Sequence, residues 1–465
     1  MDNNDSSRES LGSRLGFILL TAGCAIGLGN IWRFPFICGQ YGGAIFVLIY
    51  LFFLIALGMP VMVMELSLGR ASRRNIFGAY KTLASDKRFK WHYPGAVFFL
   101  GNIILMMFYT TVTGWMIAYA LKFAAGSLSE LDAKGVAAHF NGFLANPVAM
   151  AGFMLFTVAG STAVCAIGLQ KGVERITKFL MASLFLLLIG LCLRTLFLPG
   201  AAEGLSFYLF PNPESIRHVG LPRVIVEAMN QAFFTLSLGV GSIAIFGSYI
   251  DRSHTLPKET LAIVALDTLV AILAGVIIFP ACFSFGVRPD SGPGLVFVSL
   301  PNVFNVMQGG RIWGTLFFLF MSAAALTTVV AVFENIIAFL IDELKFSRLA
   351  ASLTTGIGIA VLSLPCAFGY NLLSGVHPLG GNSTFLDLED YIVSGNLLPL
   401  GSLFVVLFCT SRYGWGWKNF LTEANTGSGI RFPSALRIYV TVVIPVLIVL
   451  LFSIGLARQW FGFDI

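Results

Sequence analysis

Residues 27–35 read GLGNIWRFP and stand in the middle of an apolar run that extends from about residue 15 to 37. Two glycines and an asparagine in a membrane helix favour an unwound stretch, whose carbonyl and amide groups then become available to a ligand. Arg33 follows at a depth where a charge is costly, so we expect it to face a cavity or a partner. The stretch therefore predicts a broken helix beside a buried site.

A second interruption, TLSLGVG at 235–241, lies inside the apolar run at about 222–250. The two interrupted runs are about five spans apart, and a repeat of five helices re-enters the membrane upside down. Matched breaks are typical of inverted-repeat transporters, in which half-helix amino ends attract anionic groups and carbonyl ends attract cations. Glycines could instead serve only close helix packing. The matched positions and the buried arginine favour a site for a zwitterion and cations.

The composition indicates a membrane protein, because 57% of the 465 residues are hydrophobic and only 11% are charged, whereas soluble domains carry roughly a quarter charged residues. The apolar runs are long enough for helices and lack the alternation of transmembrane strands. The cysteines show neither disulfide nor metal-ligand spacing, and we interpret them as small apolar fillers. They are Cys24, Cys38, Cys165, Cys192, Cys282, Cys366 and Cys409.

These runs predict an all-α integral membrane protein with about eleven transmembrane helices. We interpret the chain as a single transporter domain, 1–465, with one repeat at about 14–196, a second at about 222–410 and an extra helix at about 434–457. Helices one and six of this 5+5 inverted repeat carry the unwound stretches. The predicted spans are about 15–37, 42–69, 93–124, 147–168, 174–196, 222–250, 258–285, 309–341, 349–369, 387–410 and 434–457.

The distribution of Lys and Arg predicts the orientation in the inner membrane. Loops rich in these residues alternate with loops that carry few, and basic loops stay in the cytoplasm. We therefore place the amino terminus in the cytoplasm and the carboxyl terminus outside. The net charge is +6, which in a soluble protein could indicate nucleic-acid binding. Here the basic residues lie beside the helix ends, where they set the topology, so we exclude nucleic acid as a partner.

Several short motifs follow one another in the chain: Arg14-Leu15-Gly16, GLGNIWRFP at 27–35, Gly42-Gly43, Glu65 with Gly69-Arg70, and AFFTLSLGVG at 232–241. In their order and spacing, residues from about 8 to 410 resemble the neurotransmitter:sodium symporter family, in particular its leucine-transporter-like bacterial amino acid transporters. The resemblance implies sodium-coupled symport of an amino acid into the cell by alternating access, and no enzymatic activity. The implied partners are an amino acid, sodium ions and the lipid bilayer, while the oligomeric state stays open.

The resemblance also implies two sodium sites made of oxygen ligands, which suit a hard cation. The first would combine the substrate carboxylate with Ala25, Asn30, Thr235 and Asp267. The second would combine backbone carbonyls with two hydroxyls, from Gly23, Ile26, Ala324, Thr327 and Thr328. The two hydroxyls could instead bond only to their own helix.

By the same resemblance, the substrate carboxylate would rest on the amides of Leu28 and Gly29 and on the Tyr109 hydroxyl. Gly27 stands where the family's monoamine carriers have an aspartate, which favours alpha-amino acids. The substrate amino group would meet oxygens of Ala25, Phe234, Thr235 and Ser237.

The implied side-chain pocket is apolar except for one hydroxyl, and its lining residues are Leu105, Phe234, Val240, Thr328 and Val332. Its two valines replace larger residues of the leucine-transporting relative, which predicts a roomier pocket. We therefore expect bulky hydrophobic or aromatic amino acids, accepted with some breadth because apolar pockets discriminate neighbours weakly.

Asp267 departs from the family pattern, since many relatives have an asparagine there and animal members place a chloride ion close by. A carboxylate supplies that negative charge itself, so we predict transport without chloride. A further hypothesis is that Asp267 takes a proton during the empty return step.

The resemblance matches the family's outer gate to Arg33 and Asp390, helped by Gln231, Tyr109 and Phe234. A buried arginine needs such a carboxylate on physical grounds as well. The inner gate would pair Arg8 with Asp342, with Tyr249 beneath. Leu11 replaces a tryptophan usual in relatives, which predicts a weaker cytoplasmic latch. Ala182 replaces a proline, which predicts less unwinding of the fifth helix.

Three other functions stay open at this point. A proton-coupled amino acid permease of the same fold would differ only in its coupling ion, and the hydroxyl pair of the second sodium site favours sodium. A sensor would bind amino acids without moving them. An intramembrane enzyme is disfavoured, because no Ser/His pair, HExxH or twin-aspartate motif lies at membrane depth.

Overall fold

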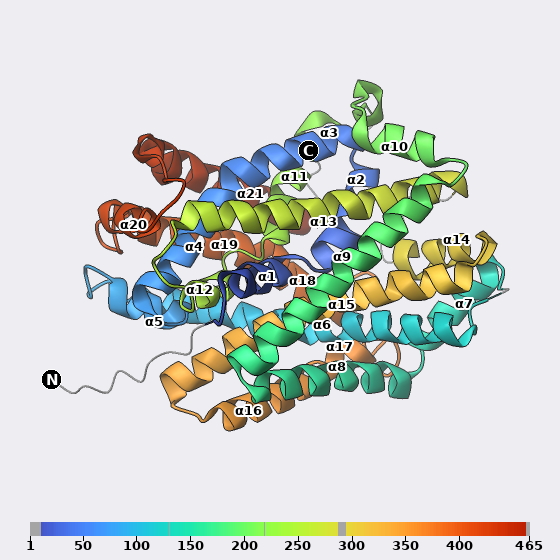
Figure 1. Ribbon diagram of the computed structural model, residues 1–465, viewed down its shortest axis with the longest axis horizontal. Coiled ribbons are helices and arrows are strands. Elements are labelled where there is room, and N and C mark those ends of the chain that lie inside the picture. Colours follow the sequence, from blue (N-terminus) through green and yellow to red (C-terminus); the bar gives the residue numbers. More distant parts are fainter. Residues whose placement is uncertain (1–10, 130, 218, 287–293, 462–465) are drawn as a thin grey trace.

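Long helices run side by side through the molecule (Figure 1). The computed structural model describes residues 11–129, 131–217, 219–286 and 294–461, and Arg8 of the predicted inner gate lies outside them. Within the described residues, nine helical segments are long and apolar enough to cross a membrane. They are Ala44–Ser72 (α3, η2, α4), His92–Ala125 (α6), Pro147–Ile167 (α8), Leu169–Leu196 (η3, α9), Leu256–Ser284 (α13), Gly310–Leu344 (α15), Arg348–Phe368 (α16, α17), Phe385–Thr410 (α18, η6, α19) and Ser434–Trp460 (η7, η8, α21).

The limits of these helices follow local signals in the sequence. α8 begins where the Asn146 side chain accepts the Ala149 N–H and a proline takes the first helical position, both typical of helix starts. The predicted span at 174–196 begins earlier, at Leu169, because Gly168 has a φ of 120° and ends the preceding helix. Apolar side chains cover the helices and the backbone groups bond internally, as a bilayer requires.

The first predicted span is a bent pair of helices. α1 (Arg14–Ala25) ends before Ile26, and the segment Gly29–Gln40, made of η1 (Gly29–Arg33) and α2 (Phe34–Gln40), leaves at an angle of 54°. The unwound stretch was predicted at Gly27 to Asn30, but Gly29 and Asn30 already belong to η1. The reason is local, because the N–H groups of Asn30 and Ile31 both bond to the Gly27 carbonyl and restart a helical turn.

The sixth predicted span, 222–250, is two helices rather than one. α11 (Leu221–Thr235) and α12 (Ser242–Gly247) are separated by residues 236–241. Ser237, Gly239 and Gly241 have φ values of 50°, 95° and 81° there, a region that glycine adopts readily and a helix cannot use. Each piece is too short to cross alone, and neither is among the nine apolar segments. If the bent pair of the first span is counted as one, the described residues contain up to ten apolar spans. The count of eleven and the inverted repeat stay predictions.

The segments predicted as loops contain short helices. α5 (Ile76–Leu83) and α20 (Trp417–Ala424) gather at one end of the long helices, at the left of Figure 1. α7 (Ala133–Leu144), α10 (Ala201–Leu209) and α14 (Leu300–Val306) gather at the other end. α7 buries Val136, Phe140 and Phe143, so its apolar face packs onto the bundle. Loops rich and poor in Lys and Arg thus lie at opposite ends, and which end faces the cytoplasm stays a prediction.

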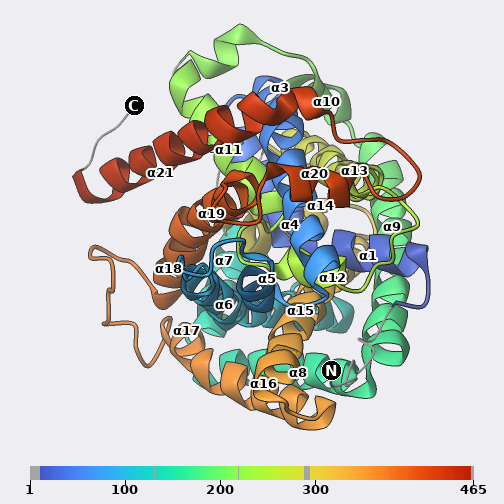
Figure 2. The ribbon, with the colours of Figure 1, turned by 90° about the vertical axis from the view of Figure 1, so that its left-hand side faces the viewer.

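The broken helices lie among the central helices of the bundle. In Figure 2, α4, α12 and α15 lie near the centre, whereas α8, α9, α16 and α21 lie at the periphery. Among the nine spans, α15 is the most buried and the segment of α21 the least. Residues of the two breaks are therefore surrounded by protein, where irregular backbone is tolerated in a membrane.

Candidate functional site

The carbonyl end of α1 faces two hydroxyls of α15. Thr328 Oγ1 donates to the carbonyl oxygens of Gly23 at 3.2 Å and Ile26 at 3.3 Å, and Thr327 Oγ1 donates to the Ala324 carbonyl at 2.7 Å. All five residues are buried. A Cβ atom on Gly23 would lie 3.2 Å from Thr327 Cβ, so the five residues predicted for the second sodium site lie together. The Thr327 hydroxyl nevertheless bonds to its own helix, as the alternative interpretation expects, whereas the Thr328 hydroxyl bonds to α1. Their oxygens are neutral and hard, and the helix end adds negative partial charge, so the set fits a monovalent cation.

A second oxygen cluster joins the two breaks. Asn30 Nδ2 donates to Asp267 Oδ1 at 2.8 Å and to the Asp267 carbonyl at 3.1 Å. Thr235 Oγ1 donates to Asp267 Oδ2 at 3.1 Å, and Asp267 is 0% exposed. These partners are neutral, so they hold the carboxylate without cancelling its charge. A buried carboxylate without a positive partner costs several kcal/mol, which makes this cluster suited to a cation.

Ala25, the remaining residue predicted for the first sodium site, is the last residue of α1 and is buried. Asn30 Oδ1 accepts the N–H of Gly27 at 3.3 Å, so the side chain of Asn30, which belongs to η1, bonds back to the backbone of the break. The side chains of the predicted first site thus meet at the break. Whether they bind sodium stays a prediction.

The first break lies directly against Tyr109 of α6. The Leu28 N–H donates to the Tyr109 hydroxyl at 2.9 Å, so two of the groups predicted to receive the substrate carboxylate touch each other. A Cβ atom on Gly27 would lie 2.1 Å from the Tyr109 hydroxyl. The chain can approach this closely only because residue 27 has no side chain.

Three of the remaining predicted substrate residues, Phe234, Ser237 and Val240, lie in or beside the second break. The Ser237 hydroxyl donates to the Cys24 carbonyl at 3.5 Å, and a Cβ atom on Gly29 would lie 2.8 Å from Phe234 Cε1. Val240 is fully buried in the break. Leu105 on α6 and Val332 on α15 are buried on helices that pack against each other. Their common role as a side-chain pocket stays a prediction.

The predicted outer gate is only partly assembled. Arg33 places its guanidinium carbon 4.3 Å from the centre of the Phe234 ring, and Gln231 Nε2 donates to the Gly29 carbonyl at 3.0 Å. Asp390 accepts a hydrogen bond from the Ser394 hydroxyl at 2.5 Å. Among the described residues, Arg33 and Asp390 do not form the expected ion pair. Arg33 instead makes a cation–π contact, which also stabilises a partly buried arginine.

Of the predicted inner gate, Asp342 and Tyr249 lie among the described residues and Arg8 does not, so the pairing of Arg8 with Asp342 stays a prediction. Asp342 Oδ2 accepts the Asn75 N–H at 3.2 Å and its side-chain amide at 3.0 Å. The Tyr249 hydroxyl donates to Glu334 Oε1 at 2.9 Å, and Arg348 pairs with Glu334 Oε2 at 2.5 Å. Leu11 packs partly buried against the core, and α9 continues without interruption through Ala182.

Two polar residues outside the predicted site form hydrogen bonds with the second break. Asn102 of α6 donates to the Val240 carbonyl at 2.7 Å and accepts from the Ser242 hydroxyl at 2.6 Å. Glu65 Oε2 accepts the Gly239 N–H at 3.0 Å. Asn102 is not singled out in the sequence analysis, although an amide inside the apolar run at 93–124 indicates a functional or structural role, because polar groups are rare in membrane spans.

Two broken helices that present buried oxygen clusters within a membrane bundle define a secondary transporter. A family profile described as "Sodium:neurotransmitter symporter family" matches residues 8–132 and 144–460. The chain belongs to this family, which consists of transporters rather than enzymes. It is therefore a multi-pass, sodium-dependent symporter.

Individual relatives support the same assignment. A sodium-dependent transporter of Bacillus subtilis, YhdH, is 39% identical over 422 residues, which cover 90% of each chain. A sodium-dependent transporter of Haemophilus influenzae is 34% identical and covers 97% of this chain and 99% of its own. The crystal structure of MhsT in complex with L-phenylalanine is similar at a TM-score of 0.86 and 36% identity, over 97% of this chain and 100% of that one.

Proposed function

We propose that this symporter couples the entry of sodium, at two sites, to uptake of an amino acid across the inner membrane by alternating access. The observation that carries the proposal is the pair of buried oxygen clusters at the helix breaks, one around Thr328 and the other around Asp267. One cluster is neutral and the other carries a carboxylate, so both favour a cation. Binding at two breaks also links the ions to any motion of the half-helices.

The substrate proposed is an alpha-amino acid with a bulky hydrophobic or aromatic side chain. An amine without a carboxylate would need a negatively charged side chain of the protein as its counter-ion. Residue 27 is a glycine and supplies none, and a Cβ atom there would already lie 2.1 Å from the Tyr109 hydroxyl. The Leu28 N–H and the Tyr109 hydroxyl lie together where a carboxylate could accept from both. MhsT, a similar structure, was solved with L-phenylalanine, which supports the aromatic class.

Transport is proposed to run without chloride. Asp267 supplies a fixed negative charge beside Asn30 and Thr235, so no diffusible anion is needed to balance the cations. The same carboxylate is proposed to take a proton when sodium has left, because an uncompensated charge in the empty site would be costly.

Uptake into liposomes tests the proposal directly. The purified protein is reconstituted, and labelled amino acids are offered with an inward sodium gradient, with equal sodium on both sides, or with a proton gradient alone. We expect accumulation only with the sodium gradient and greatest for aromatic and large aliphatic substrates. Accumulation driven by protons alone would assign the chain to proton-coupled transport, and sodium-dependent binding without accumulation would assign it to sensing.

Anion replacement tests the role of Asp267. When chloride is exchanged for gluconate, we expect the uptake rate to stay unchanged. Asp267→Asn removes the fixed charge while keeping the size of the side chain, and we expect it to lower uptake at limiting sodium. A collapse of wild-type uptake in gluconate would show that the carboxylate does not substitute for an anion.

A further inference from the structure

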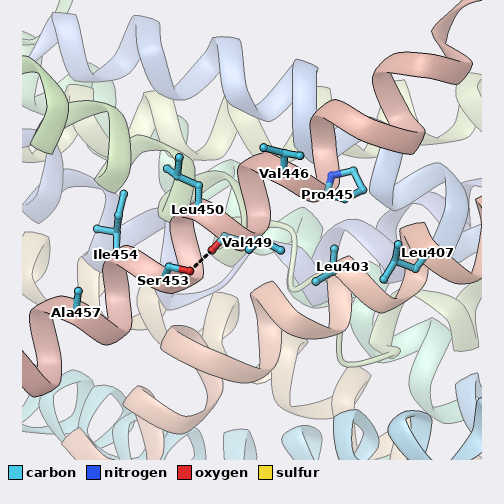
Figure 3. Close-up of a pocket in the computed structure, with 9 residues that line it drawn as sticks. All are labelled: Leu403, Leu407, Pro445, Val446, Val449, Leu450, Ser453, Ile454 and Ala457. Carbon is cyan, nitrogen blue, oxygen red and sulfur yellow. Dashed lines mark hydrogen bonds between the residues drawn. The ribbon is translucent and has the colours of Figure 1, made fainter.

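The membrane span that contains α18 and α19 has an apolar part and a polar part. α19 (Leu398–Thr410) faces α21 (Ile444–Phe461) across a groove lined by apolar side chains (Figure 3). The lining has one side-chain hydroxyl, that of Ser453, which bonds to its own helix. α18 (Phe385–Asp390) instead buries a carboxyl group, because Glu389 is only 3% exposed. An ionisable group buried within a membrane span indicates a function.

Glu389 differs from the other buried carboxyl groups in lacking an N–H or O–H donor. Each of the others in the described residues accepts at least one hydrogen bond, and they are Glu65, Glu174, Glu227, Glu259, Asp267, Glu334 and Glu423. Glu389 Oε2 is buried without a hydrogen-bond partner in the described part of the chain, and no Lys, Arg or His there pairs with the carboxyl group. A buried carboxylate without a cation or a donor is costly, so we expect it to be neutralised by a proton.

Helices on two sides enclose this carboxyl group. α17 (Leu364–Phe368) ends against the start of α18, since a Cβ atom on Gly369 would lie 3.3 Å from Phe385 Cδ2. α17 is in turn tied to α6, because the Thr110 and Ser363 hydroxyl oxygens lie 3.1 Å apart. α18 also packs against α6. The carboxyl group therefore lies between protein helices rather than toward lipid.

The titratable groups around Glu389 include no cation among the described residues. They are the Cys366 thiol of α17, the Tyr370 hydroxyl that follows it, and the carboxyl groups of Asp387 and Asp390 on α18 itself. α6 contributes Thr111 beside the thiol, and the Tyr391 hydroxyl of η6 (Tyr391–Leu397) accepts from Trp460 Nε1 instead. A sodium ion needs several hard oxygen ligands, whereas a thiol is soft. A proton therefore fits this place better than a metal ion.

We propose that Glu389 carries a proton while the outer side of the protein is closed and releases it to external water when that side opens. The next residue, Asp390, is the predicted carboxylate of the outer gate, and α18 carries both. Opening hydrates Glu389, whose O–H bond breaks to leave a carboxylate and a proton in the water. Closing takes a proton back from the same side, so no net proton crosses the membrane. An alkaline exterior therefore opposes closing.

Thermal unfolding in detergent tests the protonation without reference to transport. An unfolded chain releases the Glu389 proton above about pH 4.3, whereas the folded chain keeps it, so this group makes the wild type less stable as pH rises. Glu389→Gln has a neutral side chain of the same size and lacks this loss. We expect its unfolding temperature, relative to the wild type, to rise from about pH 5 to about pH 8.

The matched control is Glu214→Gln, which removes a carboxyl group that is 75% exposed. Its unfolding temperature relative to the wild type should not change with pH. A Glu389→Gln variant whose difference from the wild type stays constant or falls as pH rises would overturn the proposal, because Glu389 would then be ionised in the folded protein.

Infrared spectroscopy detects the proton directly, since the C=O stretch of a neutral carboxyl group is absent from a carboxylate. Saturating sodium keeps Asp267 ionised under the proposed function. We expect a neutral carboxyl band at neutral pH that is lost in Glu389→Gln and kept in Glu214→Gln. Identical spectra of the wild type and Glu389→Gln would overturn the proton site.

Uptake into liposomes at varied external pH tests the effect on the outer side, and this part alone rests on the proposed function. With the internal pH fixed, we expect wild-type uptake to fall about fivefold or more from about pH 6 to about pH 9, a range that includes the titration of buried glutamates. Glu389→Gln should change much less. Equal pH dependence of the two would overturn the control of the gate. Absence of uptake at every pH would contradict the proposed function, while the infrared band would still decide the proton site.

Discussion

A Cβ atom on Gly27 would lie 2.1 Å from the Tyr109 hydroxyl and 2.7 Å from Thr328 Oγ1. The methyl group of Gly27→Ala would therefore push apart α1 and the two helices that face the break. We expect sodium-dependent uptake to fall roughly tenfold or more, since at least one buried hydrogen bond must break. Gly152→Ala is the control, because a Cβ there meets nothing within 4 Å, and its uptake should equal the wild type. A fully active Gly27→Ala would contradict the close approach.

Thr328 differs from other threonines of α15 in where its hydroxyl points. It bonds to carbonyls of α1, whereas the Thr315 hydroxyl bonds to the Arg311 carbonyl of its own helix at 2.7 Å. Thr328→Val keeps the shape and removes one oxygen, so we expect the sodium concentration for half-maximal uptake to rise about tenfold or more. Thr315→Val should leave that concentration unchanged. Equal behaviour of the two variants would argue against a sodium ligand at Thr328.

The two breaks could be predicted from glycines and polar residues inside apolar runs, whereas the residues of the ion sites were assigned from the family resemblance, with which their chemistry agrees. Asn30, Thr235 and Asp267 are polar groups inside apolar runs, and such groups are costly unless they serve one another or a ligand. The partner of Arg33 could not be predicted in the same way. An arginine can be stabilised by an aromatic ring as well as by a carboxylate, and here its guanidinium lies over the Phe234 ring.

Among the elements, the second break depends on two neighbouring helices. The Asn102 side chain bonds to Val240 and Ser242 on either side of Gly241. Asn102→Leu leaves the Val240 carbonyl without this donor, which costs about 1–3 kcal/mol for a buried group. We expect a lower midpoint of thermal inactivation in detergent. Ser242→Ala removes only one of these bonds and should have a smaller effect, and adding it to Asn102→Leu should cost little more.

The positions of whole elements were predicted better than their internal form. Length and hydropathy define where a helix must cross, because the bilayer fixes both. They do not define where a broken helix resumes, which here depends on two N–H groups that share the Gly27 carbonyl. Nor do they predict short helices such as α7 and α20, whose stability comes from packing onto the ends of the bundle.

At the scale of the whole molecule, one carboxylate connects segments that are far apart in the chain. Glu423 of α20 pairs with Arg70 at the end of α4 at 2.7 Å and with Arg252 at 2.9 Å. The Arg70 side chain is 0% exposed, and leaving it unpaired costs about 3–5 kcal/mol. We therefore expect Glu423→Gln to unfold at a clearly lower temperature than the wild type.

The exposed pair of Glu214 and Arg217 is the control for this substitution. Its side chains are 75% and 76% exposed and 3.5 Å apart, and such surface pairs contribute about 0–1 kcal/mol. Glu214→Gln should therefore leave the unfolding temperature unchanged. Equal stability of both variants would mean that Glu423 does not hold the 411–433 segment against α4.

The orientation in the membrane can be measured with the chain's own cysteines left in place, because all seven are buried. Single cysteines are introduced at Lys87 and at Glu214, two exposed positions at opposite ends of the bundle. If the basic loops stay in the cytoplasm, a membrane-impermeant maleimide added to intact cells should label Glu214→Cys and not Lys87→Cys. Permeabilising the cells should then expose Lys87→Cys. The reverse pattern would invert the orientation and with it the assignment of Arg33 and Asp390 to the outer gate.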